Sequence, residues 1–181
     1  MTSQDIDDIS IFVGTWNMGS DTPPGDLSPW FQSQGTGKVR DKGLAKMAHD
    51  LYVIGTQESA LSEKEWISRI KDSIWGSVNI SDLHVVACLS SWSIRMVVLV
   101  KTEYKNRITR VVSNSVKTGI ANTLGNKGGV GVSFSFDGTS LCFVNCHLTS
   151  GHERNARRNQ NAHDIIKNLS VLKPKGSLPA C

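Results

Sequence analysis

Three apolar, strand-like runs of the chain each end in polar side chains that do not belong in a hydrophobic core. The first run ends at Asn17, the second at Gln57 and Glu58, and the third at His147. If these strands share a sheet and point the same way, their ends meet at one edge of that sheet. An amide oxygen and a carboxylate suit Mg²⁺, which takes few protein oxygens and completes its octahedron with water and substrate phosphate.

A cation held in this way polarises a phosphoryl oxygen and stabilises a leaving oxygen, while a nearby histidine could donate to the phosphate. Each position also has an ordinary structural interpretation. An asparagine after a strand is commonly a turn residue, a glutamate before a helix is commonly solvated or capping, and a lone histidine is commonly structural. The hypothesis of phosphoryl chemistry therefore rests on the set and its order along the chain.

Glycine-rich loops with ammonium groups precede the third polar position. Lys117–Gly119 and Gly125–Gly129 could cradle a phosphate with backbone N–H groups and two lysines. The spacing of a P-loop is absent, and an ordinary turn is an equally good interpretation. Further on, Arg154, Arg157 and Arg158 open a predicted helix. Because the last two are adjacent they point in different directions, so one could face the site, although a solvated face is the alternative.

Local signals predict the elements that position these groups. Ser62-Glu63-Lys64-Glu65 fits a capping box ahead of apolar residues at helical spacing, which predicts a helix over 62–75. Asp137-Gly138-Thr139 predicts a tight hairpin turn, since Asp-Gly supplies positive φ angles. Alternation and apolar runs predict strands at 9–17, 49–58, 84–90, 94–101, 108–113, 130–136 and 140–146, and a second helix at about 154–172.

The composition is that of an ordinary folded domain. The chain has 181 residues, 39% of them hydrophobic and 20% charged, which is enough to bury a core. The formal net charge of +4 suits an anionic partner but is too small to argue for DNA wrapping. No apolar run approaches the roughly 20 residues that cross a bilayer, and the polar, acidic N-terminus has no signal-peptide core.

The cysteines show no metal-binding pattern. None of the four stands in CxxC spacing, so we expect core thiols of an intracellular protein rather than metal ligands or a disulfide. The residues concerned are Cys88, Cys142, Cys146 and Cys181.

Four long motifs resemble one known family. They are GTWNMG at 14–19, YVIGTQE at 52–58, SVKTGIANTLGNKGGVGVSF at 115–134, and FVNCHLTSG followed by RRNQN within 143–161. In this order they are similar to the inositol polyphosphate 5-phosphatases, and among those to the Src-homology-2-containing enzymes that act on phosphatidylinositol 3,4,5-trisphosphate. The resemblance implies an α/β fold of the endonuclease/exonuclease/phosphatase type, a four-layer sandwich in which helices flank two packed β-sheets. It also implies Mg²⁺-dependent hydrolysis of the 5-phosphate of phosphoinositides.

The resemblance assigns roles to seven residues. Two match the family's metal-site amide and carboxylate, and a third matches the histidine that contacts the scissile phosphate. Two more lie in a loop similar to part of the substrate pocket, and the last two match an Arg-Asn pair that supports the site and contacts substrate. The predicted set is Asn17, Glu58 and His147 as catalytic residues, with Asn17 and Glu58 as metal ligands, and Asn126, Lys127, Arg158 and Asn159 as substrate-binding residues.

Two motifs of the family have no counterpart in the sequence. The family continues with a GDLNYR-like and then an SDH-like motif, which carry the aspartate that orients the attacking water, an asparagine at the phosphate and a terminal Asp-His pair. We therefore expect residues 1–172 to be the N-terminal portion of a catalytic domain and 173–181 a divergent tail. The missing strands should leave an open sheet edge, and the chain alone should be weakly active or inactive.

Other functions stay open. A nuclease of the same fold class would share Asn, Glu and His at its metal site, but SVKTGIANTLGNKGG resembles the inositol phosphatases specifically. A catalytically dead fragment that binds phosphoinositide or a partner protein is the third interpretation. The expected partners are a phosphoinositide or inositol phosphate and a membrane surface, without nucleic acid. The expected location is the cytoplasm, with recruitment to the inner face of the plasma membrane.

Overall fold

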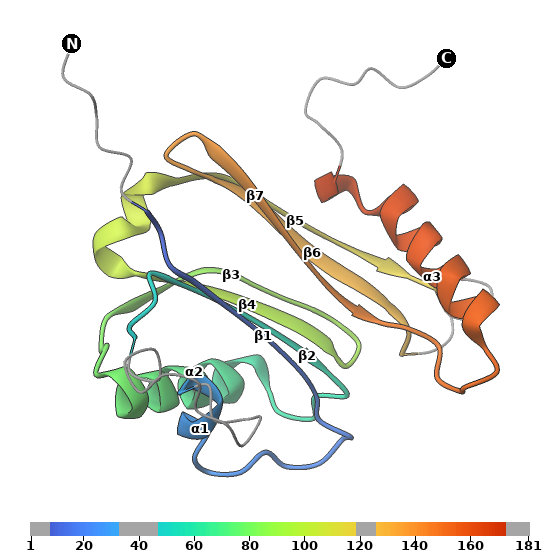
Figure 1. Cartoon of the computed structure of the whole chain (residues 1–181), viewed down its shortest axis with the longest axis horizontal. Helices are drawn as coiled ribbons and strands as arrows, with labels where there is room; N and C mark the ends of the chain where they lie inside the picture. Colours follow the sequence, from blue (N-terminus) through green and yellow to red (C-terminus); the bar gives the residue numbers. More distant parts are fainter. Residues whose placement is uncertain (1–7, 33–46, 119–125, 173–181) are drawn as a thin grey trace.

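Two β-sheets pack face to face at the centre of the computed structural model, which describes residues 8–32, 47–118 and 126–172 (Figure 1). The first sheet has the order β1-β2-β4-β3 and the second the order β5-β6-β7. The strands of the first sheet are β1 (Ile11–Asn17), β2 (Leu51–Gln57), β4 (Ile94–Lys101) and β3 (Leu83–Ser91). The strands of the second are β5 (Ile108–Lys117), β6 (Gly128–Phe136) and β7 (Thr139–His147).

Helices cover the outer faces of both sheets, so the four-layer arrangement predicted from the sequence is confirmed. The short helix α1 (Ser28–Phe31) and the longer α2 (Glu63–Val78) pack on the first sheet. Helix α3 (Asn155–Asn168) and the 3₁₀ turn η3 (Ser170–Leu172) pack on the second, and the 3₁₀ helix η2 (Thr102–Arg107) joins β4 to β5. No helix in the described ranges is long and apolar enough to cross a membrane.

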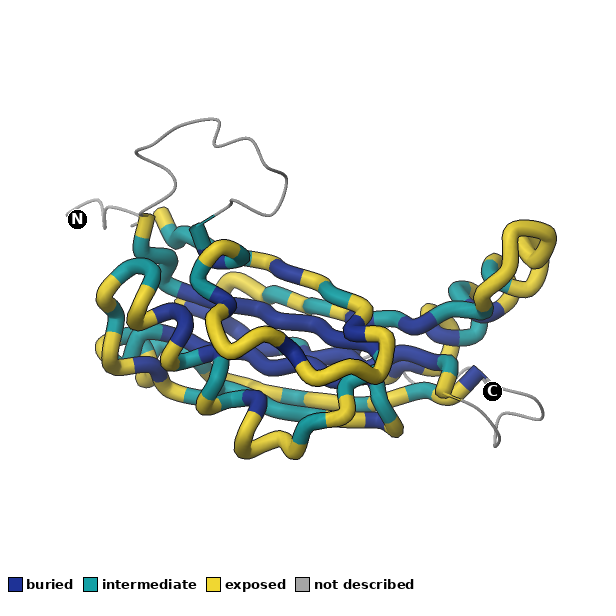
Figure 2. The backbone as a smooth tube through the Cα atoms, turned by 90° about the horizontal axis from the view of Figure 1, so that it is seen from below, coloured by how far each residue is buried: buried dark blue, intermediate teal, exposed yellow. Residues whose placement is uncertain are grey.

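The hydrophobic core of the described residues has three clusters, one on each side of the first sheet and a smaller one between the second sheet and α3 with η3. Tyr52 and Ile54 of β2 pack against the helices, whereas Leu51 and Val53 pack against the second sheet. Because both of its faces are covered, β2 is buried along its whole length and reads as a continuous apolar run rather than an alternating one. Figure 2 shows these buried central strands in dark blue, with exposed segments around them.

The local signals for the first helix and the hairpin are confirmed. Ser62 caps α2, its hydroxyl accepting from the Glu65 backbone N–H at 3.3 Å while a Glu65 carboxylate oxygen accepts from the Ser62 N–H at 3.1 Å. Asp137 and Gly138 have φ values of 46° and 87°, which are the positive angles expected for the turn between β6 and β7.

Three predicted ends are wrong by three or more residues. Helix α2 runs to Val78 instead of ending at 75. Strand β5 continues to Lys117 instead of ending at 113, because its pairing with β6 resumes after a register shift between Thr109 and Val112. The second helix ends at Asn168 instead of 172, where Leu169 adopts extended backbone angles. The chain then turns through η3, and both Leu169 and Val171 reach the surface of β6.

The prediction of core thiols is correct only in part. Cys88 and Cys146 are half-buried and Cys142 is exposed, whereas Cys181 lies outside the described residues. Cys142 is exposed because it stands on the edge strand β7, whose outer face the 3₁₀ turn covers incompletely. Burial raises the pKa of the Cys88 thiol to about 11, so this cysteine is a protonated apolar group at neutral pH.

Two glycines let α3 and η3 lie close to β6, and they should differ in tolerance. A methyl group at Gly131 would stand 2.7 Å from both Leu169 Cδ2 and Val171 Cγ2, whereas at Gly129 it would stand 3.0 Å from Ile165 Cγ2. We expect Gly131→Ala to lower the free energy of unfolding by about 1–3 kcal/mol, because overpacking moves well-packed neighbours. Gly129→Ala should cost clearly less. Urea unfolding of both variants checks this, and equal costs would contradict it.

A polar network closes the end of the first sheet opposite Asn17. Asp50 accepts from the Ser10 backbone N–H at 2.9 Å and from Lys101 Nζ at 2.7 Å. Burial by itself raises the pKa of the Asp50 carboxyl, but the hydrogen bonds from Lys101 and Ser10 outweigh it and hold the pKa below its ordinary value. A carboxyl with a lowered folded-state pKa stabilises the fold above its unfolded-state pKa of about 3.9, and this stabilisation is lost as the pH falls through the folded-state pKa.

We therefore expect the stability difference between the parent and Asp50→Asn to be largest above pH ~4 and to shrink steadily below it. The neighbouring His49, whose pKa burial lowers, also gains charge on acidification, so both proteins should carry His49→Gln. Chemical unfolding from pH 6 to pH 2.5 measures the difference, with exposed Asp21→Asn as the matched control. A difference independent of pH would show that Asp50 acts through packing rather than through its charge.

Candidate active site

The parallel strands β1 and β2 end side by side and place Asn17 next to Glu58. Asn17 pairs with Gln57 in the register, and Glu58 follows directly. The Asn17 side-chain nitrogen donates to Glu58 Oε1 at 3.3 Å, while its oxygen accepts from the Gly19 backbone N–H at 3.0 Å. Glu58 has a φ of 54°, a left-handed conformation that is uncommon for a residue with a side chain and that recurs at functional sites.

His147 reaches the same place from the second sheet. The condition of a single shared sheet is therefore not met, because β7 belongs to the other sheet. The strand ends still converge, since β7 packs over β2 and β4. His147 Nε2 lies 3.4 Å from Glu58 Oε1, and the imidazole is almost fully buried.

Lys127 is the fourth member of this group. Its ammonium nitrogen lies 2.7 Å from His147 Nε2, because Gly128 pairs directly with His147 across β6 and β7. A methyl group at Gly128 would stand 2.2 Å from the Val116 carbonyl oxygen, so only glycine lets β5 and β6 approach closely enough to hold Lys127 here. The structure thus brings together Asn17, Glu58, Lys127 and His147.

The electrostatics of the group favour a neutral imidazole. Burial lowers the pKa of His147, the Lys127 ammonium lowers it further, and Glu58 opposes both. Burial also lowers the pKa of Lys127, again opposed by Glu58. A neutral His147 can accept from Lys127 at Nε2 or donate from Nε2 to Glu58, but one tautomer cannot do both. Either Nε2–H or the ammonium can serve as a donor to an anionic ligand.

Asn145, a buried asparagine that the sequence interpretation missed, joins β7 to β2 and β4 next to the group. Asn145 Nδ2 donates to the Thr56 and Arg95 carbonyl oxygens, each at 2.9 Å, and its Oδ1 accepts from Gln57 Nε2 at 2.5 Å. A methyl group at Gly55 would stand 2.8 Å from Asn145 Cγ, so this glycine leaves room for the side chain. A polar residue inside the apolar run FVNC, with a glycine inside the apolar run YVIGT, was the available signal.

Arg158 has a local role in this structure. Its guanidinium donates to the Thr149 carbonyl oxygen at 3.2 Å and also contacts the Gly151 carbonyl oxygen and the Asn155 side chain. It therefore holds the loop that follows His147. Fully buried Asn161, also missed, accepts from the Thr149 hydroxyl at 2.7 Å and donates to the Thr118 carbonyl oxygen at 3.3 Å.

The other two predicted positions, Asn126 and Asn159, are both exposed. Asn126 is exposed and precedes Lys127, and its backbone faces the His147 ring. Asn159 is exposed on α3. Of the two predicted phosphate-binding loops, residues 119–125 lie outside the described residues. Substrate contact by Asn126, Arg158 and Asn159 stays a prediction.

The donor chemistry of the group fits a hard divalent cation. Glu58 offers a carboxylate and Asn17 an amide, which are oxygen ligands of the kind that Mg²⁺ takes. No cluster of three or more His, Cys, Asp or Glu that could hold a metal occurs in the described ranges 8–32, 47–118 and 126–172. Asn17 and Glu58 would therefore hold a cation here, and its other ligands would come from water, substrate or further protein groups.

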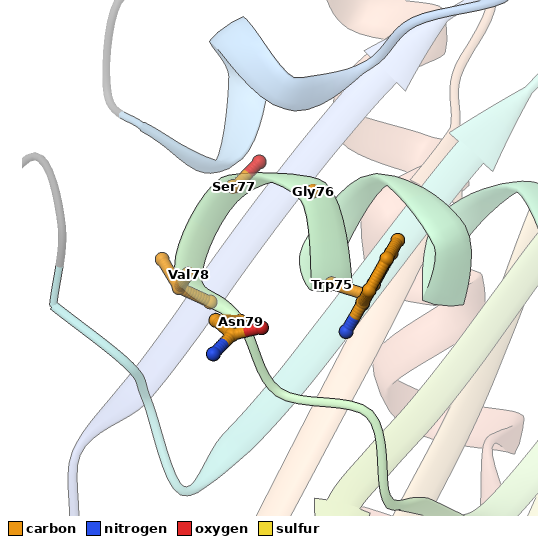
Figure 3. A pocket seen from close by; sticks show the side chains of 5 residues that line it. All are labelled: Trp75, Gly76, Ser77, Val78 and Asn79. Atoms are coloured by element: carbon orange, nitrogen blue, oxygen red, sulfur yellow. The ribbon is translucent and has the colours of Figure 1, made fainter.

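The group does not coincide with the hollow at the end of α2. Figure 3 shows that hollow, which the last turn of α2 lines with Trp75, Gly76, Ser77, Val78 and Asn79. It offers no acidic side chain and no histidine, and it lies away from the strand ends. The strand-end group is the better candidate for chemistry.

The chain is similar in sequence to a known protein family and to two human enzymes. Residues 14–178 match the Endonuclease/Exonuclease/phosphatase family 2. The chain is 53% identical over 165 residues to human phosphatidylinositol 3,4,5-trisphosphate 5-phosphatase 2, and 54% identical over 165 residues to human phosphatidylinositol 3,4,5-trisphosphate 5-phosphatase 1. These alignments cover 91% of this chain but only 13% and 14% of the two relatives. The resemblance predicted from the motifs is confirmed.

Solved structures share the fold. The inositol polyphosphate 5-phosphatase domain of SPsynaptojanin, in complex with inositol (1,4)-bisphosphate and calcium, matches with a TM-score of 0.72 and 24% identity. The match covers 89% of this chain and 46% of that one. A Cimex nitrophorin in its ferrous NO complex matches with a TM-score of 0.56 and 11% identity, over 82% of this chain and 50% of that one. At these identities the likeness concerns the fold alone.

Proposed function

The chain belongs to the Endonuclease/Exonuclease/phosphatase family 2, and from that premise we propose that it is the N-terminal part of a phosphoinositide 5-phosphatase domain. The proposal covers residues 1–172 as the partial domain and 173–181 as a tail. The observation that carries it is the convergence of Asn17, Glu58, Lys127 and His147 at one end of the sandwich. The substrate class comes from the relatives, which are named for phosphatidylinositol 3,4,5-trisphosphate.

In this proposal the side chains divide the work of phosphoryl transfer. Asn17 and Glu58 would hold Mg²⁺, which supplies charge stabilisation to the phosphoryl and leaving oxygens. The Lys127 ammonium would offset one negative phosphate oxygen. His147 would donate to a second oxygen once its Nε2 carries the proton and the ammonium has moved off that nitrogen. Strand pairing fixes the backbone of His147 opposite Gly128, which holds the imidazole at the site.

The attacking water needs a further group. No residue of this chain matches the family motif that carries the water-orienting aspartate, and hydrolysis requires an oriented nucleophile. We therefore propose that the chain alone binds substrate and turns it over weakly or not at all. A binding fragment without turnover is accordingly the second candidate function, and the missing motif is the observation that favours it.

An exposed aromatic residue beside the site supports contact with a membrane surface. Trp92, at the tip of the β3–β4 hairpin, is 59% exposed, and Lys117 Nζ lies 5.5 Å from its ring centroid. The hairpin tip is tied to the site edge because the Ser59 backbone N–H donates to the Ser93 carbonyl oxygen at 3.1 Å. An indole next to a lysine suits the interface of an anionic bilayer. This arrangement fits a cytoplasmic enzyme that works at the inner face of the plasma membrane.

The test is phosphate release from a short-chain phosphatidylinositol 3,4,5-trisphosphate, with Mg²⁺ and with EDTA. The chain is compared with a chimera in which residues 14–178 replace the matching segment of the human 5-phosphatase 2 catalytic domain. We expect EDTA-sensitive release from the chimera and little from the chain alone. A folded chimera that releases no phosphate would refute the proposed hydrolase, and cleavage of an oligonucleotide instead would point to a nuclease. Lipid binding by the chain without turnover would support the second candidate.

A further inference from the structure

Arg95 of β4 is a buried arginine whose charge is balanced by hydrogen bonds. It is 6% exposed, and no ion pair links its guanidinium to an acidic side chain among the residues that the structure describes. Removing a charged group from water is costly unless its donors find partners. The groups that accept these hydrogen bonds therefore show what the burial achieves.

The loop between Glu58 and α2 receives most of the hydrogen bonds. Three acceptors of the guanidinium lie within residues 59–62. They are the Leu61 carbonyl oxygen at 2.8 Å, the Ser62 carbonyl oxygen at 3.3 Å and the Ser59 hydroxyl at 3.4 Å. Two of the three are backbone atoms, so Arg95 holds the path of the chain as well as a side chain. We call residues 59–62 the Glu58 loop.

A relay to a carboxylate completes the network. Arg95 Nε donates to the Ser90 hydroxyl at 3.1 Å, and that hydroxyl donates to Glu63 Oε1 at 2.6 Å. Glu63 is the first residue of α2, directly after the Glu58 loop. The carboxylate therefore offsets the guanidinium charge through Ser90, and both terminal nitrogens of the guanidinium stay available to the loop.

The backbone of Arg95 is fixed by two other strands. Arg95 pairs with Thr56 of β2, and its carbonyl oxygen accepts from Asn145 Nδ2 of β7 at 2.9 Å. The guanidinium thus reaches from a rigid backbone to the beginning of α2, on the outer side of the first sheet (Figure 1). A side chain anchored in this way is a fixed point to which a loop can be tied.

The Glu58 loop follows a residue with a strained backbone. Glu58 has a φ of 54°, and residues with side chains keep such conformations only where the surroundings impose them. On one side the Glu58 carbonyl oxygen accepts from the Ser20 backbone N–H at 3.1 Å. On the other side the loop is held by Arg95 and by the hydrogen bond from the Ser59 N–H to the Ser93 carbonyl oxygen at 3.1 Å. The contacts of Arg95 therefore act on the backbone that directs the Glu58 carboxylate.

We propose that Arg95 is a positioning residue, whose guanidinium ties the Glu58 loop to β4 and so fixes the direction of the Glu58 carboxylate. The inference rests on the proposed function, in which Glu58 holds the catalytic cation. The guanidinium hydrogen bonds go to the loop and to Ser90, so Arg95 acts on Glu58 through the backbone. Partners that orient a metal ligand in this way contribute to metal affinity and to the rate.

Hydrogen exchange in the 181-residue chain tests the positioning without any substrate. Arg95→Met removes every donor but keeps an extended apolar side chain, whereas Arg95→Lys keeps the charge without the planar fork of donors. Exchange of the amides at 58–62 should be about tenfold or more faster in Arg95→Met, because the loop opens locally once its ties are lost. Arg95→Lys should recover only part of the protection. Gly131→Ala, whose overpacking lies in the second sheet, is the control and should leave these amides unchanged.

Kinetics of the chimera test the consequence for the reaction. The Arg95→Met chimera should need a Mg²⁺ concentration about threefold or more higher for half-maximal rate, and its kcat should fall about tenfold. The KM for the lipid should stay near the parent value. The Gly131→Ala chimera also loses stability, and it should show the Mg²⁺ requirement of the parent. If circular dichroism shows that Arg95→Met does not fold, Arg95→Lys decides, since a raised Mg²⁺ requirement supports the proposal and the parent value overturns it.

Three outcomes would overturn the proposal. They are unchanged exchange at 58–62 in Arg95→Met, an Arg95→Met chimera with the Mg²⁺ requirement of the parent, and full recovery by Arg95→Lys in both measurements, which would leave only the charge to act. A parent chimera that releases no phosphate would refute the proposed function instead, and the exchange rates would then still decide whether Arg95 holds the loop. An active parent chimera with unchanged Arg95→Met kinetics would refute the positioning role alone.

Discussion

Replacing Glu58 by glutamine should lower 5-phosphate hydrolysis by the chimera about 10²–10³-fold, mostly in kcat. The Glu58 carboxylate stands between two other members of the site, with Oε1 3.3 Å from Asn17 Nδ2 and 3.4 Å from His147 Nε2. Glutamine keeps the shape of the side chain but removes its charge. The variant should therefore bind a divalent cation less tightly. It also removes the negative charge that now raises the pKa of Lys127 against the lowering effect of burial.

Two controls separate this chemistry from a loss of folding. Glu103→Gln makes the same change at an exposed position on η2, and it should leave the rate unchanged. A Mg²⁺ titration should show that the Glu58→Gln chimera needs a higher concentration for half-maximal rate, at an unchanged melting temperature. A rate within threefold of the parent would show that Glu58 does not hold the catalytic cation, and the site assignment would then be wrong.

The sequence was a reliable guide where the structure depends on neighbours along the chain. The capping box at Ser62 and the Asp137-Gly138 turn are decided by hydrogen bonds and φ angles within four residues, and both are confirmed. The strands were also recognisable, because two covered faces impose a continuous apolar run on β2 and β4. Such signals located the polar residues at the strand ends.

The sequence was a poor guide where the outcome depends on packing between distant segments. The apolar pattern of β7 does not say which sheet it joins, so the sequence could state a shared sheet for His147 and Asn17 only as a condition, and the structure does not meet it. Their proximity survived because the two sheets pack with those strand ends together. The contacts of Arg158 depend on where the chain turns after β7, and no local pattern reports the carbonyl oxygens of that loop.

Asn145 is the residue whose loss should cost the fold most among the polar groups near the site. Asn145→Ala should lower the free energy of unfolding by about 2–4 kcal/mol, because it leaves the Thr56 and Arg95 carbonyl oxygens buried without their donor. It also removes one of the two acceptors of Gln57 Nε2, directly before Glu58, and leaves the Thr15 hydroxyl as the other. Urea unfolding measures the cost. Asn168→Ala, the same change on the exposed surface of α3, should cost far less.

A second substitution tests whether Asn145 acts through its fit against β2. Gly55→Ala alone should be strongly destabilising, because its methyl group would stand 2.8 Å from Asn145 Cγ. In the Asn145→Ala background the same methyl group enters the space that the asparagine has left, so its cost should fall by at least about 1 kcal/mol. Contacting residues couple in this way, whereas independent ones add. Additive costs would mean that the two sheets are not joined through this pair, and that the position of His147 relative to Glu58 is set elsewhere in the sandwich.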